Sequence, residues 1–231
     1  ELTQFLEGYP QRYLRLVDPT HVYEHVRLSR NLKSTEVQAS LTKTDAAWQL
    51  STIAVDQPKL FANICGVLSY FGMDILRGQA MANENGIVLD LFQFEDREGY
   101  LRLNTSAEQE LIDLLGDVVA GKIDITNKLE GRKRGRIHKH PREDFKPVIR
   151  FNNHYSRRFT VMELVAENAL GLLHQISQSI SSQHCDIELV LISTQGVQAL
   201  DVFHLTTNGE KLSDATQGAL KETLRSTLIP T

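Results

Sequence analysis

Residues 48–71 read WQLSTIAVDQPKLFANICGVLSYF, and the period of the apolar residues changes within this stretch, at the loop 56–60. Before the loop, alternation predicts a strand over Leu50 to Val55. After it, apolar residues recur every three to four positions and predict an amphipathic helix. That helical stripe consists of Leu60, Phe61, Ile64, Val67, Leu68 and Phe71. Gly72 stands where a helix C-terminus favours a left-handed residue.

Two strands and a turn are expected next. Met73 to Ala82 reads as a strand, 83–86 (Asn-Glu-Asn-Gly) as a turn, and Ile87 to Phe94 as an almost wholly apolar strand. The order strand, helix, strand, strand is the front of a βαββαβ unit. We therefore expect an α+β fold.

The same unit recurs in the second half of the chain. The pair 74–75 (Asp-Ile) returns at 186–187, the run 89–92 (Leu-Asp-Leu-Phe) returns at 200–203 as Leu-Asp-Val-Phe, and the helical stripe returns from Leu172. The distance between equivalent positions stays at 111 or 112 residues through a strand, a helix and a hairpin. A constant offset through three elements predicts two copies of one domain, packed against each other.

An additional strand precedes each copy, namely Val37 to Leu41 before the first and Val148 to Asn152 before the second. After a helix expected at about 212–224, the second copy has too little chain left for a fourth strand. Two alternatives stay open at this point. Either the leading strands replace the missing fourth strands, or the strand at Val148 closes the first domain.

The segments outside the repeat read as a helical lead-in and a linker. We expect domains at 36–130 and 146–231, a lead-in at 1–35 and a basic linker at 131–145. His21 and His25 are four residues apart, but without a third ligand we interpret them as an ordinary helix face rather than a metal site. Residues 105–109 resemble a capping box at the start of a second helix. The run 132–142 is strongly basic, and because aromatic residues do not interleave with the basic ones, we interpret it as a solvated linker.

Composition sets broad limits on partners and compartment. The formal net charge of −4 calls for neither a nucleic-acid partner nor an anionic membrane. The two cysteines, Cys65 and Cys185, favour reduced thiols in a cytoplasmic protein. No apolar run approaches the roughly 18 residues of a membrane span. Because the chain begins at Glu1 without methionine, we expect a fragment of a longer protein.

The order strand, Asp-x-Pro loop, helix, Asp-Ile strand resembles the ACT domain, a small ferredoxin-like module that senses amino acids. Residues 152–164 (NNHYSRRFTVMEL) and 9–14 (YPQRYL) are similar to segments of the tandem ACT region in the C-terminal part of bacterial PII uridylyltransferase/uridylyl-removing enzymes. The resemblance implies a regulatory amino-acid-sensing module, with glutamine as the suspected ligand. It also implies the PII signalling protein as a partner of the parent enzyme, and it requires no cofactor.

The resemblance places ligand-binding residues in two loops and at the strand starts. They are Asp56, Gln57, Pro58, Lys59, Leu60 and Asp74 in the first copy, and Asn168, Ala169, Leu170, Gly171, Leu172, Asp186 and Ile187 in the second.

The two loops depart differently from the family pattern. Lys59 replaces the usual glycine in the first loop, whereas the second keeps Gly171 and loses the aspartate and the proline. A glycine lets backbone amides approach a carboxylate at a helix N-terminus. We therefore expect the site on 168–172, with Asp186 or a facing residue of the other copy reading the ligand's amino group. The competing hypothesis is that Lys59 pairs with the carboxylate.

No catalytic or metal-binding residues are expected in this chain. The parent enzyme's transferase needs a paired Asp-x-Asp and its hydrolase an adjacent His-Asp, and the sequence has neither. An RNA-recognition module shares the element order but needs a basic and aromatic third strand, which Ile87 to Phe94 does not provide. A dimerisation or interdomain-docking module without a ligand, and a homodimer, stay open as alternatives to amino-acid sensing.

Overall fold

The computed structural model describes residues 1–10, 13–17, 19–30, 32, 36–44, 47–133, 146–195 and 197–229. The strands are β1 (Val37–Lys43), β2 (Trp48–Val55), β3 (Asp74–Ala82), β4 (Ile87–Glu95), β5 (Val148–Asn152), β6 (Thr160–Glu167), β7 (Asp186–Gln195) and β8 (Gln198–Thr206). The helices are α1 (Leu2–Leu6), α2 (Tyr13–Leu16), α3 (Pro19–Ser29), α4 (Leu60–Tyr70), α5 (Tyr100–Leu103), α6 (Ala107–Val119), α7 (Ile125–Lys133), α8 (Leu172–Ser182) and α9 (Asp214–Leu228).

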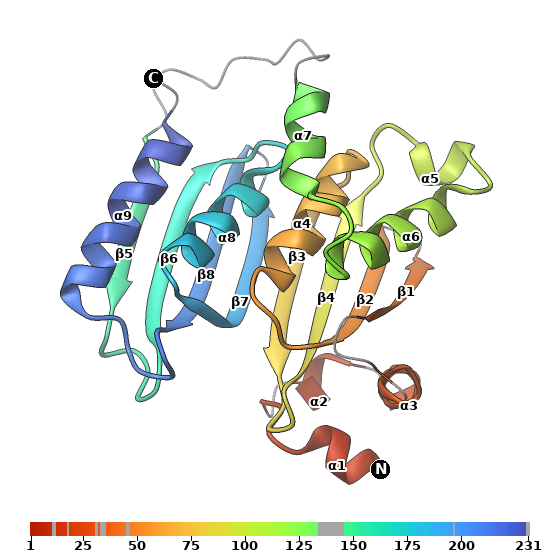
Figure 1. The fold of residues 1–231 in the computed structure, drawn as a ribbon, viewed down its shortest axis with the longest axis horizontal. Coiled ribbons are helices and arrows are strands. Elements are labelled where there is room, and N and C mark those ends of the chain that lie inside the picture. The colour runs from red at the N-terminus through yellow and green to blue at the C-terminus, as the bar shows by residue number, and fades with distance from the viewer. Residues whose placement is uncertain are drawn as a thin grey trace.

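All eight of these strands form one antiparallel sheet in the order β1-β2-β4-β3-β7-β8-β6-β5 (Figure 1). From one edge the order is β1-β2-β4-β3, and from the other edge it is β5-β6-β8-β7. Each strand thus has the same place in its half as its counterpart in the other copy. The expected α+β architecture of two ferredoxin-like halves is confirmed. The halves join edge to edge where β3 pairs with β7, from Arg77 opposite Ser193 to Met81 opposite Leu189.

The leading strands complete both halves. β1 pairs with β2 and β5 pairs with β6, each antiparallel and each at an outer edge of the sheet. This edge is where the fourth strand of a βαββαβ sheet would lie. Of the two alternatives that the sequence left open, replacement of the fourth strand is therefore correct, and the strand at Val148 belongs to the second half.

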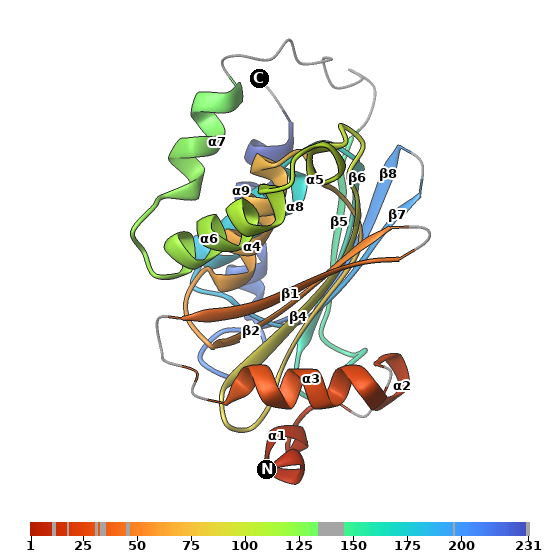
Figure 2. The same cartoon turned by 90° about the vertical axis from the view of Figure 1, so that its right-hand side faces the viewer.

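One face of the sheet carries the main helical layer of α4, α6, α7, α8 and α9 (Figures 1 and 2). The main hydrophobic core lies between this layer and the sheet, and it contains the whole apolar stripe expected for α4. Gly72 follows that helix with φ +79°, and its N–H donates to the Ser69 carbonyl oxygen at 3.0 Å, as expected for a helix end.

The N-terminal helices cover the opposite face of the first half only. A second apolar cluster joins Phe5, Tyr13 and Val26 of the lead-in to Ile53 and Leu89 of the sheet. Figure 2 shows α3 lying apart from the main helical layer. His25 is buried in this region, with Nδ1 2.9 Å from the Tyr13 hydroxyl. His25 therefore packs inside this cluster.

Several local expectations differ from the structure. The capping box at 105–109 does not form; Ser106 instead donates its hydroxyl to Glu110 Oε1 at 2.6 Å, because α6 begins at Ala107. The last helix runs from Asp214 to Leu228 rather than over 212–224, since Ser213 caps it by accepting from the Thr216 N–H. α5 and α7 were not predicted.

α7 includes Arg132 and Lys133, so the helix extends into the range expected for the linker, and the remaining basic run lies outside the described residues.

Cys65 and Cys185 are buried, free thiols. Among the described residues, no helix is both long enough and apolar enough to cross a membrane.

Candidate functional site

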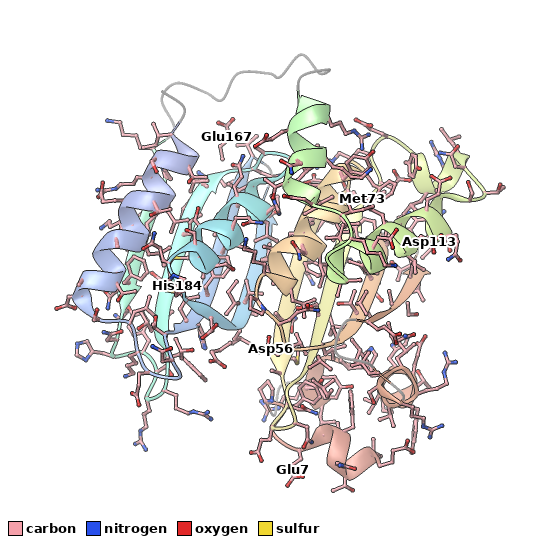
Figure 3. All side chains as sticks on the ribbon, in the orientation of Figure 1. Glu7, Asp56, Met73, Asp113, Glu167 and His184 are labelled. Carbon is pink, nitrogen blue, oxygen red and sulfur yellow. The ribbon has the colours of Figure 1, made fainter. Side chains whose placement is uncertain are left out.

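The two loops that precede α4 and α8 lie at opposite ends of the sheet. Figure 3 labels Asp56, in the first loop, and Glu167, which directly precedes the second. Because β3 and β7 run antiparallel, the start of each strand lies beside the other copy's loop. The expected site residues therefore separate into two groups instead of forming one site.

The second loop builds the N-terminus of α8. Gly171 is the N-cap residue with φ +84°, and the helix carries no side-chain cap. The Leu172 N–H donates to the Ala169 carbonyl oxygen at 3.0 Å, which closes a tight turn before the helix. The first-turn amides and the helix dipole make this end attractive to an anion.

Residues of the first copy complete this end. Asn168 donates its side-chain amide to Asp74 Oδ1 at 3.2 Å, and Arg97 forms an ion pair with Asp74 Oδ2 at 2.5 Å. Thr194 donates its hydroxyl to the Ile75 carbonyl oxygen at 2.9 Å. The facing residue of the other copy is thus Asp74. Asp186, the other candidate, does not lie at this loop.

A cavity of about 30 Å³ lies among these groups, and Gly171, Asn168, Asp74 and Asp201 all line it. Its remaining walls are largely apolar and include Met73, Leu172, Leu173 and Ile192. The site thus combines a carboxylate, an amide side chain and backbone N–H donors. Because the surrounding walls are largely apolar, the local dielectric constant is low and each polar contact is stronger than in water.

Asp201 is a candidate site residue that the sequence analysis did not identify. An aspartate in the middle of a strand is ordinarily a polar residue on the open face of a sheet, but Asp90 and Asp201 do not lie on that face. They are 1% and 2% exposed and alternate in phase with Phe92 and Phe203, which face the helical layer. That phase is readable in the sequence. Burial raises the pKa of Asp90 to about 8 and that of Asp201 to about 7.

The first loop has the same backbone but different chemistry. Lys59 takes the N-cap position of α4 with φ +66°, a conformation that a side chain strains. Partial desolvation raises the pKa of Asp56, and the nearby Glu188 adds to this effect. Desolvation also raises the pKa of Asp186, followed by the charge of Asp56. Asp186 therefore lies beside the first loop. The acidic side chains gathered there disfavour the binding of a ligand carboxylate.

A larger cavity of about 410 Å³ follows the outer face of α8, between α7 and α9. It shares Ser69, Leu170 and Gly171 with the small cavity, so the two spaces meet at the start of α8. Its polar lining is neutral along most of its length, with Gln175, Gln178, Ser179, Ser182, Thr223 and Thr227. Within the described residues, no cluster of His, Cys, Asp and Glu could hold a metal ion.

Known proteins match the chain over most of its length. It is 30% identical to a bifunctional uridylyltransferase/uridylyl-removing enzyme of Gluconobacter oxydans, over 98% of this chain. The corresponding enzymes of Novosphingobium aromaticivorans and Azospirillum brasilense are 28% and 25% identical, over 81% and 86% of this chain. The chain resembles a region of these bifunctional enzymes.

It covers only 21% to 25% of the length of these relatives. No protein-family model matches. The resemblance to a part of this enzyme, expected from residues 9–14 and 152–164, is thereby confirmed. The conclusion concerns a region of such a protein and not the whole enzyme.

Proposed function

We propose that this chain is a regulatory module that binds a small amino acid, with L-glutamine as the expected ligand, in a PII uridylyltransferase-like protein. The cavity at the start of α8 carries the proposal, because two copies of one domain contribute to it. The amides of the α8 N-terminus suit the ligand carboxylate, and the carboxyls of Asp74 and Asp201 suit its amino group. Binding there would stabilise the β3–β7 junction.

The larger cavity of about 410 Å³ along α8, which we call the groove, adds room for the side chain of the ligand. Gly171 stands where the small cavity and the groove meet, and neutral hydrogen-bonding groups such as Gln175 and Gln178 line the groove beside it. A carboxamide side chain finds donors and acceptors there without a charge to desolvate. The two charged residues of this lining, Glu130 and Arg132, have opposite signs, so the preference for glutamine over glutamate rests on the neutral groups beside Gly171.

Isothermal titration of L-glutamine into the chain tests the proposal. Millimolar affinity requires only about −4 kcal/mol, which a few hydrogen bonds and one charge-assisted contact supply. L-glutamate and L-leucine serve as controls for the carboxamide and for the polar groove. Absence of heat with glutamine, together with an unchanged melting temperature, would reject amino-acid sensing by glutamine.

The names of the relatives suggest the output. We propose that the module belongs to a protein that acts on the PII signalling protein, and that this chain alone neither transfers nor removes uridylyl groups. Its sequence lacks the paired Asp-x-Asp and the adjacent His-Asp that such reactions need. Turnover of UTP, or release of uridylyl groups from modified PII by the purified chain, would contradict this.

A docking or dimerisation module is the second candidate. On the sheet face opposite the main helical layer, the lead-in helices cover the first half, but no helix among the described residues covers the second half. Leu191 and Val148 on that side are 37% and 42% exposed. Exposed apolar residues on an uncovered sheet face favour association. Light scattering over a concentration series would detect a homodimer, and substitution of Leu191 by Lys should then dissociate it.

A further inference from the structure

The two copies hold an aspartate at the same position but surround it differently. In the first copy, Thr52 is the cross-strand neighbour of Asp90 and donates its hydroxyl to Asp90 Oδ2 at 3.3 Å. In the second copy, the equivalent neighbour of Asp201 is Leu164, which has no polar side-chain atom. Among the described residues, nothing donates a hydrogen bond to the Asp201 carboxyl or pairs with its charge, and its Oδ1 is completely buried. Asp201 therefore carries an unmet requirement for a donor.

This carboxyl lies at the cavity of about 30 Å³, which has space for roughly one water-sized group. Burying a carboxylate against walls such as Met73, Leu173 and Ile192 is unfavourable unless a cation or donors compensate it. The other titratable groups that face this region are Asp74, already paired with Arg97, and Cys65, whose pKa is raised mainly by burial and further by Asp90 and Asp201. A small cation with several N–H donors would satisfy Asp201.

We propose that Asp201 binds the primary ammonium group of the amino-acid ligand inside this cavity, where Asp74 and Asn168, which also line it, position that group. The inference rests on the proposed amino-acid site and names the residue that binds the positively charged group of the ligand. A primary ammonium, R–NH3+, is compact and has three donors, so it fits a space that a secondary or quaternary ammonium, with fewer N–H donors and more bulk at nitrogen, does not. Asp90 has no such role, because it does not line the cavity, although its Oδ1 is likewise buried without a partner and Thr52 donates only to its Oδ2.

The ligand class follows from this assignment. The site takes an unmodified α-amino acid with a free amino group, and it rejects the deaminated acid of the same length. Rejection arises because the deaminated acid leaves the buried carboxyl of Asp201 without its donor. The carboxamide end of the ligand plays no part in this discrimination, since it lies toward the groove on α8.

Calorimetry with L-glutamine and its deaminated analogue, 4-carbamoylbutanoate, tests the assignment on three proteins: the unmodified chain, Asp201→Asn and Asp90→Asn. We expect Asp201→Asn to bind L-glutamine roughly 10-fold or more weakly and to lose the preference for the amino group. Asp90→Asn should retain both. Asp201→Asn that binds L-glutamine as tightly as the unmodified chain would overturn the assignment.

A second measurement separates this inference from the choice of glutamine. The carboxyl carbon of Asp201, assigned with Asp201→Asn, is titrated by NMR in methylammonium chloride and in sodium chloride at equal ionic strength. We expect methylammonium to lower the pKa of Asp201, because it stabilises the ionised form. Equal pKa values in the two salts would overturn the inference even if glutamine binds. A shift with methylammonium but no heat with glutamine would reject glutamine as the ligand and keep Asp201 as the ammonium site.

Discussion

His174 Nδ1 lies 2.7 Å from the carbonyl oxygen of Ala62, the residue that holds the equivalent position in the other copy. Because a carbonyl oxygen only accepts, Nδ1 must carry the hydrogen. The two helices α4 and α8 thus meet at corresponding points, and His174 is 4% exposed there. The side chain that lines the groove on one side therefore also joins the two halves on the other.

The close approach of the helices depends on Gly66. A Cβ at this position would lie 2.8 Å from His174 Nδ1 and 3.0 Å from Ile125. We expect Gly66→Ala to destabilise the chain by about 1–3 kcal/mol through overpacking, although alanine favours helices. The control is Gly116→Ala in α6, where no atom lies within 4 Å and about 0.5–1 kcal/mol of stabilisation is expected. Urea denaturation of both variants measures this, and stabilisation by Gly66→Ala would contradict the tight contact.

The two helix-start loops should differ in ligand binding. Gly171→Val places a branched side chain at φ +84° and directs it into the open space where the two cavities meet. We expect at least a 10-fold loss of L-glutamine affinity. Lys59→Gly should leave binding unchanged, because its loop faces Asp186 and Glu188 instead. Titration calorimetry decides, with melting temperatures as the folding control; loss of binding in Lys59→Gly alone would favour Lys59 as the carboxylate partner.

Stability should fall as pH rises because of Asp201. Its pKa is raised by burial to about 7 in the folded chain from the ordinary aspartate value of 3.8, so the folded state holds the proton more tightly than the unfolded state between these pH values. The favourable contribution is complete below about pH 4 and is lost as pH rises through about 7. From pH 5 to pH 8 the loss is about 2–3 kcal/mol. Chemical denaturation of Asp201→Asn should show a weaker decline over this range, whereas substitution of the exposed Asp113 should keep it. An unaltered decline in Asp201→Asn would contradict the raised pKa.

Acid should loosen the helical lead-in through His25. Burial lowers its pKa to about 4 from 6.5, so the unfolded state takes up the proton first as pH falls. The contribution of neutral His25 is complete above about pH 6.5 and is lost toward pH 4, by about 2 kcal/mol at pH 5. His25→Gln should remove this part of the pH dependence, and His21→Gln, at an exposed position of α3, should not. Denaturation at pH 7.5 and pH 5 compares them; equal pH dependence in all three proteins would refute the assignment.

The sequence by itself determined the local structure and the repeat. Alternation before Asp56 and the stripe after Leu60 specify β2 and α4, because the two periods differ and only one suits each element. The offset of 111 or 112 residues specified two similar halves. Gly171 in the second loop and Lys59 at the equivalent position of the first loop already distinguish the two loops in the sequence.

Only the tertiary structure decided which residues meet. The strand that completes each half pairs with its sequence neighbour, β1 with β2 and β5 with β6, but the sequence alone left open which half the strand at Val148 joins. The pairing of β3 with β7 joins segments more than 100 residues apart, which local patterns do not encode. That pairing brings Asp74 to Asn168 and leaves Asp186 with Asp56 at the other end. It also closes the cavity around Asp201. This carboxyl lacks a hydrogen-bond donor because its cross-strand neighbour is Leu164, whereas Thr52 stands across from Asp90 in the first copy. A sequence specifies the faces of its elements, but the partners at a long-range junction follow from how the two halves pack.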